Sequence, residues 1–173
     1  MARADDGAGR NDLTGVVVAE LIRRGWTIAA AESLTGGELT AELTRVPGAS
    51  AAVLGGAVVY ATELKHTLLG VDAALLHAHG PVHPEVARQL ASGVRRRLAV
   101  GGRTADVGVA TTGVAGPEPQ GGRPVGTVFV GVSSERGTRA VELALTGSRA
   151  EIRRDVVAEA VRQLAGELGI AAL

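Results

Sequence analysis

Three side chains in the sequence have the chemistry for nucleophilic catalysis: Ser33, Tyr60 and Lys65. Ser33 lies between a short apolar run and a Thr-Gly-Gly segment, a position where a hydroxyl can be exposed at a strand-to-helix turn. A lysine buried among apolar neighbours has a lowered pKa, so its neutral amine can accept the proton of a serine hydroxyl. Since Ser–Lys pairs replace Ser–His in some hydrolases, Ser33 and Lys65 are candidates for acyl-transfer chemistry.

The composition of the basic residues draws attention to Lys65. Of the 18 Lys and Arg residues, 17 are arginine, and Lys65 is the only lysine. Arginine serves the surface roles of lysine but does not release its proton at ordinary pH, so it cannot act as a base. Two simpler interpretations stay open: Lys65 lies exposed on a helix beside Glu63, and Ser33 or Thr35 only caps the following helix.

Three Gly-containing loops offer hydroxyls and main-chain N–H groups that can bind an anion or a developing oxyanion. They are residues 32–37, 112–117 and 146–149. In an open α/β sheet, such loops converge on one crevice at the carboxyl ends of the strands. With 25 glycines in the chain, an ordinary connecting turn is the simpler interpretation of any one loop.

Apolar runs and amphipathic segments alternate along the chain, which is typical of one α/β domain with helices on both faces of a mixed sheet. Strands are predicted at residues 27–31, 52–60 with a bulge at the Gly55-Gly56 pair, and 105–112, with a hairpin at 126–133 and 139–145. Helices are predicted after Asp12, after residues 32–37, at 61–69, at 72–77, from Pro84 and behind a Ser148/Glu151 capping box. These elements place Ser33 and Tyr60 at strand ends and Lys65 in the next helix.

Length and composition restrict the classes of protein to which the chain can belong. A chain of 173 residues with 46% hydrophobic side chains suits one packed domain, predicted at residues 12–170 behind a mobile arm at 1–11. Zero net charge and 2% aromatic residues argue against a nucleic-acid partner. The sequence has no cysteine, no apolar run of membrane-spanning length and no signal-peptide core, so we expect a cytoplasmic protein without a membrane partner.

The four histidines are the one group in the sequence that suggests a metal site. They are His66, His77, His79 and His83. No nearby pattern of Asp, Glu or Cys completes a ligand set, so solvated loop histidines and no metal are predicted. The arginines at 95–97 are interpreted as a solvated helix face.

Six separated motifs, in order, resemble the CinA C-terminal family, which includes stand-alone nicotinamide mononucleotide amidases. The motifs are residues 31–37 (AESLTGG), 46–50 (VPGAS), 59–71 (VY with KxxxxGV), 79–82 (HGPV), 112–117 (TGVAGP) and 124–128 (PVGTV). The likeness extends over residues 12–168. The resemblance implies a single-domain, three-layer α/β/α sandwich around a mixed sheet.

The resemblance also implies hydrolysis of nicotinamide mononucleotide to nicotinic acid mononucleotide and ammonia, without a metal or organic cofactor. The family's catalytic residues map to Ser33, Lys65 and Tyr60, where Tyr60 is expected to relay or hold the Ser33 proton. The oxyanion is expected to meet main-chain N–H groups of Thr35, Gly36 and Gly37. The remaining substrate-binding positions are Thr112, Gly113, Gly116 and Arg149, with Arg149 a candidate for the substrate phosphate. Exposed strand edges lead us to expect a homodimer.

The chain departs from the family pattern around these residues. The departures are at Leu34 (commonly Cys), Ala61 and Thr62 (Ser-Asn), His83 (usually Ser) and Ser148 (usually Asp). They leave two alternatives to the nucleotide amidase: a nucleotide-binding or regulatory domain that has lost catalysis, and an amidase for another small carboxamide.

Overall fold

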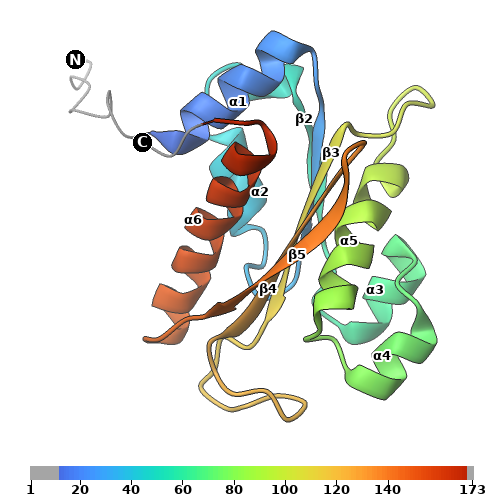
Figure 1. Cartoon of the computed structure of the whole chain (residues 1–173), viewed down its shortest axis with the longest axis vertical. Helices are drawn as coiled ribbons and strands as arrows, with labels where there is room; N and C mark the ends of the chain where they lie inside the picture. Colours follow the sequence, from blue (N-terminus) through green and yellow to red (C-terminus); the bar gives the residue numbers. More distant parts are fainter. Residues whose placement is uncertain (1–11, 171–173) are drawn as a thin grey trace, which may run out of the picture.

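The computed structural model describes residues 12–170 and has a mixed sheet at its centre (Figure 1). Its strands are β1 (Ile28–Glu32), β2 (Val53–Val58), β3 (Val107–Gly113), β4 (Thr127–Ser134) and β5 (Gly137–Ala144). They lie in the order β2-β1-β3-β4-β5; β1 runs parallel to β2 and β3, whereas β4 is antiparallel to both of its neighbours. The arm predicted at residues 1–11 lies outside the described residues.

Helices cover both faces of the sheet, which confirms the three-layer α/β/α sandwich (Figure 1). One face carries α1 (Leu13–Arg24), α2 (Glu38–Thr44) and α6 (Arg149–Glu167); the other carries α3 (Thr62–Leu69), α4 (Ala73–His79) and α5 (Pro84–Arg97). No helix within residues 12–170 combines the length and the apolarity needed to cross a bilayer.

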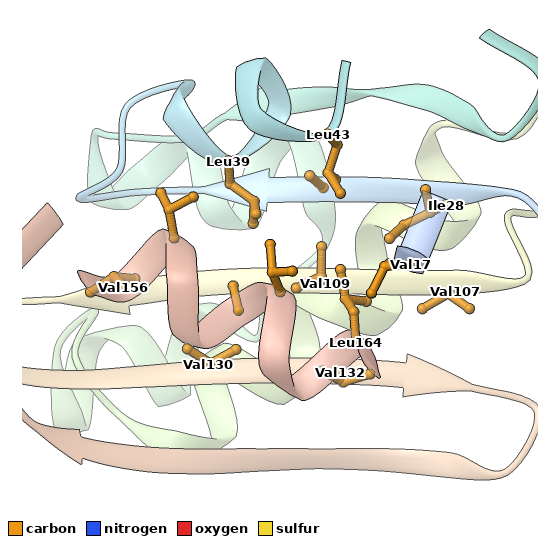
Figure 2. Close-up of a cluster of buried hydrophobic side chains, with 14 of the residues drawn as sticks. Val17, Ile28, Leu39, Leu43, Val107, Val109, Val130, Val132, Val156 and Leu164 are labelled. Carbon is orange, nitrogen blue, oxygen red and sulfur yellow. The ribbon is translucent and has the colours of Figure 1, made fainter. Parts of the chain in front are cut away.

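Both faces of β1 are buried, which explains why this strand appears in the sequence as a continuous apolar run. Ile28 and Ala30 pack into the core beneath α1, α2 and α6, whereas Ala29 and Ala31 pack into the core on the α3–α5 side. Figure 2 shows the first of these cores, in which Leu39 and Leu43 of α2 and Val156 and Leu164 of α6 lie over the sheet residues Ile28, Val109 and Val130.

The element boundaries differ from the predicted ones by a few residues. β2 is shorter than the predicted strand, and its irregularity lies at Leu54, one residue before the predicted bulge, because Ile28 pairs with Val53 and Ala29 with Gly55 while Gly55 and Gly56 pair regularly. α4 continues to His79, two residues beyond the predicted end, because Gly80 is the first residue with a positive φ after it. β5 starts at Gly137 rather than at Arg139.

Helix α5 packs directly on the backbone of the sheet through glycines. A Cβ on Gly131 of β4 would lie 2.2 Å from the Ala87 carbonyl oxygen, and a Cβ on Gly108 of β3 would lie 2.1 Å from that of Ala91. Any larger residue at these positions pushes α5 away from β3 and β4, since the contacting atoms are backbone and cannot rotate aside.

We predict that Gly131→Ala lowers the free energy of unfolding by roughly 1–3 kcal/mol, the usual cost of overpacking. The matched control is Gly166→Ala in α6, where no heavy atom lies within 4 Å of the new Cβ. That substitution is expected to leave stability unchanged or to raise it by up to about 1 kcal/mol. Urea unfolding measures both variants, and equal stability of the two would contradict the close packing of α5.

Candidate active site

Ser33 and Tyr60 lie at the same edge of the sheet because the strands before them are parallel. The Ser33 amide donates to the Thr111 carbonyl at 3.1 Å, and the Val59 amide donates to the Glu32 carbonyl at 2.8 Å. These two bonds extend the strand pairing one residue beyond β1 and β2. The chain then turns into α3, whose second turn carries Lys65 back toward Ser33.

Lys65 is 1% exposed, and its amine meets three oxygen atoms. Nζ donates to the Val59 carbonyl at 2.7 Å, to Ser33 Oγ at 3.1 Å and to the Tyr60 carbonyl at 3.4 Å. Glu63 is exposed and is not a partner of the amine. The interpretation of Lys65 as a solvated helix residue is therefore wrong.

Burial lowers the pKa of Lys65 to about 8. The protonated amine can donate to all three oxygens, and after loss of one proton its two remaining N–H groups can still donate to the carbonyls while its lone pair becomes available to the Ser33 hydroxyl. Ser33 is itself buried, with 8% of its surface exposed. The amine thus lies within hydrogen-bond distance of the Ser33 hydroxyl, and its neutral form becomes the major one only above about pH 8.

A cavity of about 110 Å³ opens beside the Ser33–Lys65 pair. Six of the predicted site residues line it besides Ser33: Tyr60, Lys65, Thr112, Gly113, Gly116 and Arg149. Sequence reasoning missed the further lining residues Leu34, Pro81, Val82, Val114, Ala115, Glu118 and Gln120. Most of these residues lie inside the six motifs identified in the sequence, but neither their types nor their spacing indicated a role in the site.

The three predicted oxyanion residues lie outside this cavity lining. The Thr35 hydroxyl shares a hydrogen bond with Thr111 Oγ1, at 2.8 Å. The Gly36 amide donates to the Ser33 carbonyl at 3.1 Å, and the Gly37 amide donates to Glu32 Oε2 at 2.9 Å. The amides of Gly36 and Gly37 are therefore not free for an oxyanion, because the turn itself and the Glu32 carboxylate occupy them.

The amide of Leu34 fits an oxyanion better. It directly follows Ser33, the candidate nucleophile, its residue lines the cavity, and it has no hydrogen-bond acceptor among residues 12–170. The amide that follows a nucleophile is a common oxyanion donor. Because the main chain supplies this donor, a leucine serves here as well as a cysteine.

Tyr60 and Arg149 meet at the mouth of the cavity. Arg149, the first residue of α6, donates from Nη2 to the Tyr60 hydroxyl at 3.1 Å and from Nη1 to the Gly116 carbonyl at 2.7 Å. Tyr60 is 60% exposed, and within residues 12–170 no hydrogen bond joins its hydroxyl to Ser33 or Lys65. Its main-chain carbonyl, rather than its phenol, contacts the Lys65 amine.

Thr112 has a structural contact. Its hydroxyl donates to the Pro81 carbonyl at 2.7 Å and so ties the segment before α5 to the end of β3. This bond fixes the wall of the cavity on the side of Pro81 and Val82. The Thr112 hydroxyl retains only its lone pairs for a ligand.

The histidines form no group with metal-ligand geometry: the described part of the chain holds no cluster of three or more His, Cys, Asp or Glu side chains able to ligate a metal. The rings of His79 and His83 stack with their centroids 4.8 Å apart. His83 Nδ1 accepts from the Glu85 amide and caps α5. Burial, and next the charge of His79, lower the pKa of His83.

Comparison with known proteins gives matches over most of the chain. Residues 10–168 match the model of the CinA C-terminal domain. A CinA-like protein of Frankia casuarinae is 48% identical over 164 residues, which are 92% of this chain and 37% of that protein. A CinA-like protein of Gemmatimonas aurantiaca is 46% identical over 150 residues, which are 85% of this chain and 33% of that protein. The chain thus spans about a third of the length of these curated relatives.

Solved structures agree with this assignment. A CinA superfamily protein of Klebsiella pneumoniae has a TM-score of 0.83 and 31% sequence identity, and the match covers 92% of this chain and 99% of that one. A second one, from Enterobacter cloacae, has a TM-score of 0.85 and 25% identity, with 97% and 98% covered. The residues that match the family model, 10–168, include all five strands of the sheet and the residues that line the cavity beside Ser33.

The buried amine makes stability depend on pH. The pKa of Lys65 is about 8 in the folded chain against 10.5 when solvated, so between these values the unfolded chain binds more protons. Its contribution to the free energy of unfolding is therefore complete above pH 10.5 and is lost as the pH falls to 8.

We predict that wild-type stability, measured by urea unfolding relative to Lys65→Met, rises by on the order of 3 kcal/mol across this interval. The methionine variant keeps the length of the side chain and has no proton to bind, so it isolates the contribution of Lys65. Parallel pH profiles for the two proteins would mean that the amine is solvated.

Proposed function

The chain belongs to the CinA C-terminal domain family, and on that premise we propose that it hydrolyses the carboxamide of nicotinamide mononucleotide to give nicotinic acid mononucleotide and ammonia. The observation that carries this proposal is the 3.1 Å contact between the Lys65 amine and the Ser33 hydroxyl, with Lys65 1% exposed and beside a cavity. A surface capping serine and a solvated lysine would not be found in this arrangement.

Acylation begins with proton transfer from Ser33 Oγ to Lys65 Nζ as the oxygen attacks the carboxamide carbon. The carbonyl π electrons move onto the oxygen, which becomes the oxyanion, and the Leu34 amide donates to it. One oxyanion donor contributes about 3 kcal/mol to such a step. The Val59 and Tyr60 carbonyls hold the protonated amine in place until it returns the proton.

Lys65 then gives its proton to the leaving nitrogen, the carbon–nitrogen bond breaks, and ammonia departs from a Ser33 acyl ester. Water attacks that ester while its proton passes to Lys65. The Ser33–carbon bond breaks, the acid product leaves, and Lys65 returns the proton to Ser33 Oγ. Each group ends as it began, and every proton movement uses the one amine.

Arg149 suits the phosphate of the substrate. It lies at the cavity mouth, it is the first residue of α6, and its guanidinium can form two parallel hydrogen bonds with a phosphate. Its present partners are neutral oxygens of Tyr60 and Gly116, which a phosphate would outcompete by charge. The carboxamide would then enter toward Ser33.

We predict that purified protein releases ammonia from nicotinamide mononucleotide and that Ser33→Ala and Lys65→Met lower kcat by roughly 10²–10⁴-fold or more. The reason is that each variant removes one partner of the proton transfer. The control is Glu63→Gln, which changes the acidic residue nearest to Lys65 on α3 and should keep wild-type turnover. An enzymatic ammonia assay measures all four proteins.

In the same assay, kcat/KM should rise with pH and level off above an apparent pKa near 8, since protonated Lys65 cannot act as a base. A rate that stays flat through pH 8 would contradict the role of Lys65. Tight binding of the nucleotide without ammonia release would instead favour a binding domain that has lost catalysis. Turnover of other small carboxamides alone would favour a different amidase.

We predict that Arg149→Ala raises KM for nicotinamide mononucleotide roughly 10–100-fold, the usual effect of losing a hydrogen bond to a charged group. KM for nicotinamide riboside, which has no phosphate, should change little. Steady-state kinetics with both substrates test this expectation. A similar increase in KM for both substrates would show that Arg149 shapes the cavity instead of binding the phosphate.

A further inference from the structure

We propose that Glu32 and Arg153 are positioning residues that hold the turn after Ser33 so that the Leu34 amide faces the oxyanion. This inference rests on the proposed amidase function. The turn, here called the nucleophile turn, comprises residues 33–37. Glu32 precedes it directly in sequence, and Arg153 approaches it from α6.

Glu32 is fully buried and its carboxylate accepts four hydrogen bonds. The donors are the amides of Gly37 (2.9 Å), Leu39 (3.0 Å) and Thr40 (2.7 Å) and the Thr40 hydroxyl (2.6 Å). A buried carboxylate is tolerated only where donors satisfy it, and these four also bring it against the positive end of α2. Glu32 thus joins the end of β1 to the start of α2 beneath the nucleophile turn.

Arg153 holds the nucleophile turn from α6. Its Nη2 donates to the Thr35 carbonyl at 3.0 Å and pairs with Glu38 Oε1 at 2.7 Å. The peptide that carries the Thr35 carbonyl also carries the Gly36 amide, which donates to the Ser33 carbonyl. Arg153 and Ser33 therefore fix this peptide plane from both ends.

These contacts satisfy most main-chain amides around the nucleophile turn and leave two of them without an acceptor in the described residues. Within residues 12–170, every amide from Gly36 to Thr40 has an acceptor, whereas those of Leu34 and Thr35 have none. The turn needs glycine at two places, because Gly36 and Gly37 have φ values of 61° and 107°. The amide of Leu34 is thus left without an acceptor in a turn held by its neighbours, and its residue lines the cavity beside Ser33.

The way other helices of this chain are capped argues that the link is specific to the site. Asp12, Asp72 and Ser148 cap α1, α4 and α6 from the N-cap position itself. The N-cap of α2 is Gly37, which has no side chain, and the acceptor comes from Glu32 beside the nucleophile. A local cap would stabilise α2 equally well but would leave the Ser33 turn unattached.

The test uses Arg153, whose guanidinium is partly exposed, so that its variants fold. Arg153→Ala should lower kcat for nicotinamide mononucleotide roughly tenfold to a hundredfold, with KM within about twofold, because a displaced donor affects the transition state and not substrate binding. Arg153→Lys should restore much of the loss, since lysine can still donate to the Thr35 carbonyl. Circular dichroism melting checks that the variants are folded.

Two controls separate positioning from general stability. Arg154→Ala removes the same charge one residue away on the exposed side of α6, and Glu38→Gln breaks the ion pair of Arg153 without touching its bond to Thr35. Both should keep the wild-type kcat. A kcat for Arg153→Ala equal to that of these controls would overturn the inference, as would equal loss in all three variants.

A second readout does not depend on the substrate. A fluorophosphonate probe reacts with an activated serine: the Ser33 oxygen bonds to phosphorus, fluoride leaves and the Ser33 proton passes to Lys65. The phosphoryl oxygen occupies the oxyanion position, so Arg153→Ala should slow labelling, followed by intact mass, by a factor similar to that for kcat. Glu32→Gln, if it folds, should slow it too.

The outcomes distinguish the two proposals. Labelling of wild-type Ser33 without ammonia release would overturn the nucleotide substrate but leave the positioning role open to the labelling rates, which then decide it. Absence of both labelling and ammonia release would overturn the nucleophile and this inference with it. Unchanged labelling in Arg153→Ala and in a folded Glu32→Gln would overturn the positioning role alone.

Discussion

The site depends on keeping one lysine amine out of water. A lysine amine in the interior is tolerated only where oxygen atoms replace its hydration, and here the Val59 and Tyr60 carbonyls and the Ser33 hydroxyl do so. Those three atoms come from two segments that follow parallel neighbouring strands. The desolvation that lowers the pKa of Lys65 and the pairing of β1 with β2 are thus parts of one constraint.

The layers of the fold supply the remaining parts of the site. The three parallel strands bring Ser33, Tyr60 and Thr112 to one edge of the sheet, because their carboxyl ends all lie there. Helix α6 begins near the same edge, where Arg149 contacts Gly116 and Tyr60 and Arg153 contacts Thr35 of the nucleophile turn. One helix therefore connects the region proposed for phosphate binding to the region proposed for the oxyanion.

The departures from the family pattern become less severe once their contacts are known. Ser148 caps α6 and closes a capping box with Glu151, a role that aspartate would also fill. His83 caps α5 through Nδ1. Leu34 lines the cavity, and its own main-chain amide has no acceptor within residues 12–170, so the side chain at this position does not determine whether that donor is available. Ala61 occupies the N-cap position of α3 and provides no side-chain hydrogen bond to the helix. The structure does not explain why a small polar residue is replaced at this position.

The sequence alone determined the order and type of the elements, since the apolar periods, the glycine stops and the capping residues are local signals. It also singled out Ser33 and Lys65, because one lysine among 17 arginines and a serine at a strand-to-helix turn are visible without any contact. Only the tertiary structure decided which amides are free, that Tyr60 offers its carbonyl to Lys65, and that Glu32 and Arg153 support the turn. The physical reason is that hydrogen-bond partners are assigned when distant segments pack: Arg153 and the Thr35 carbonyl lie 118 positions apart, and no spacing rule links them.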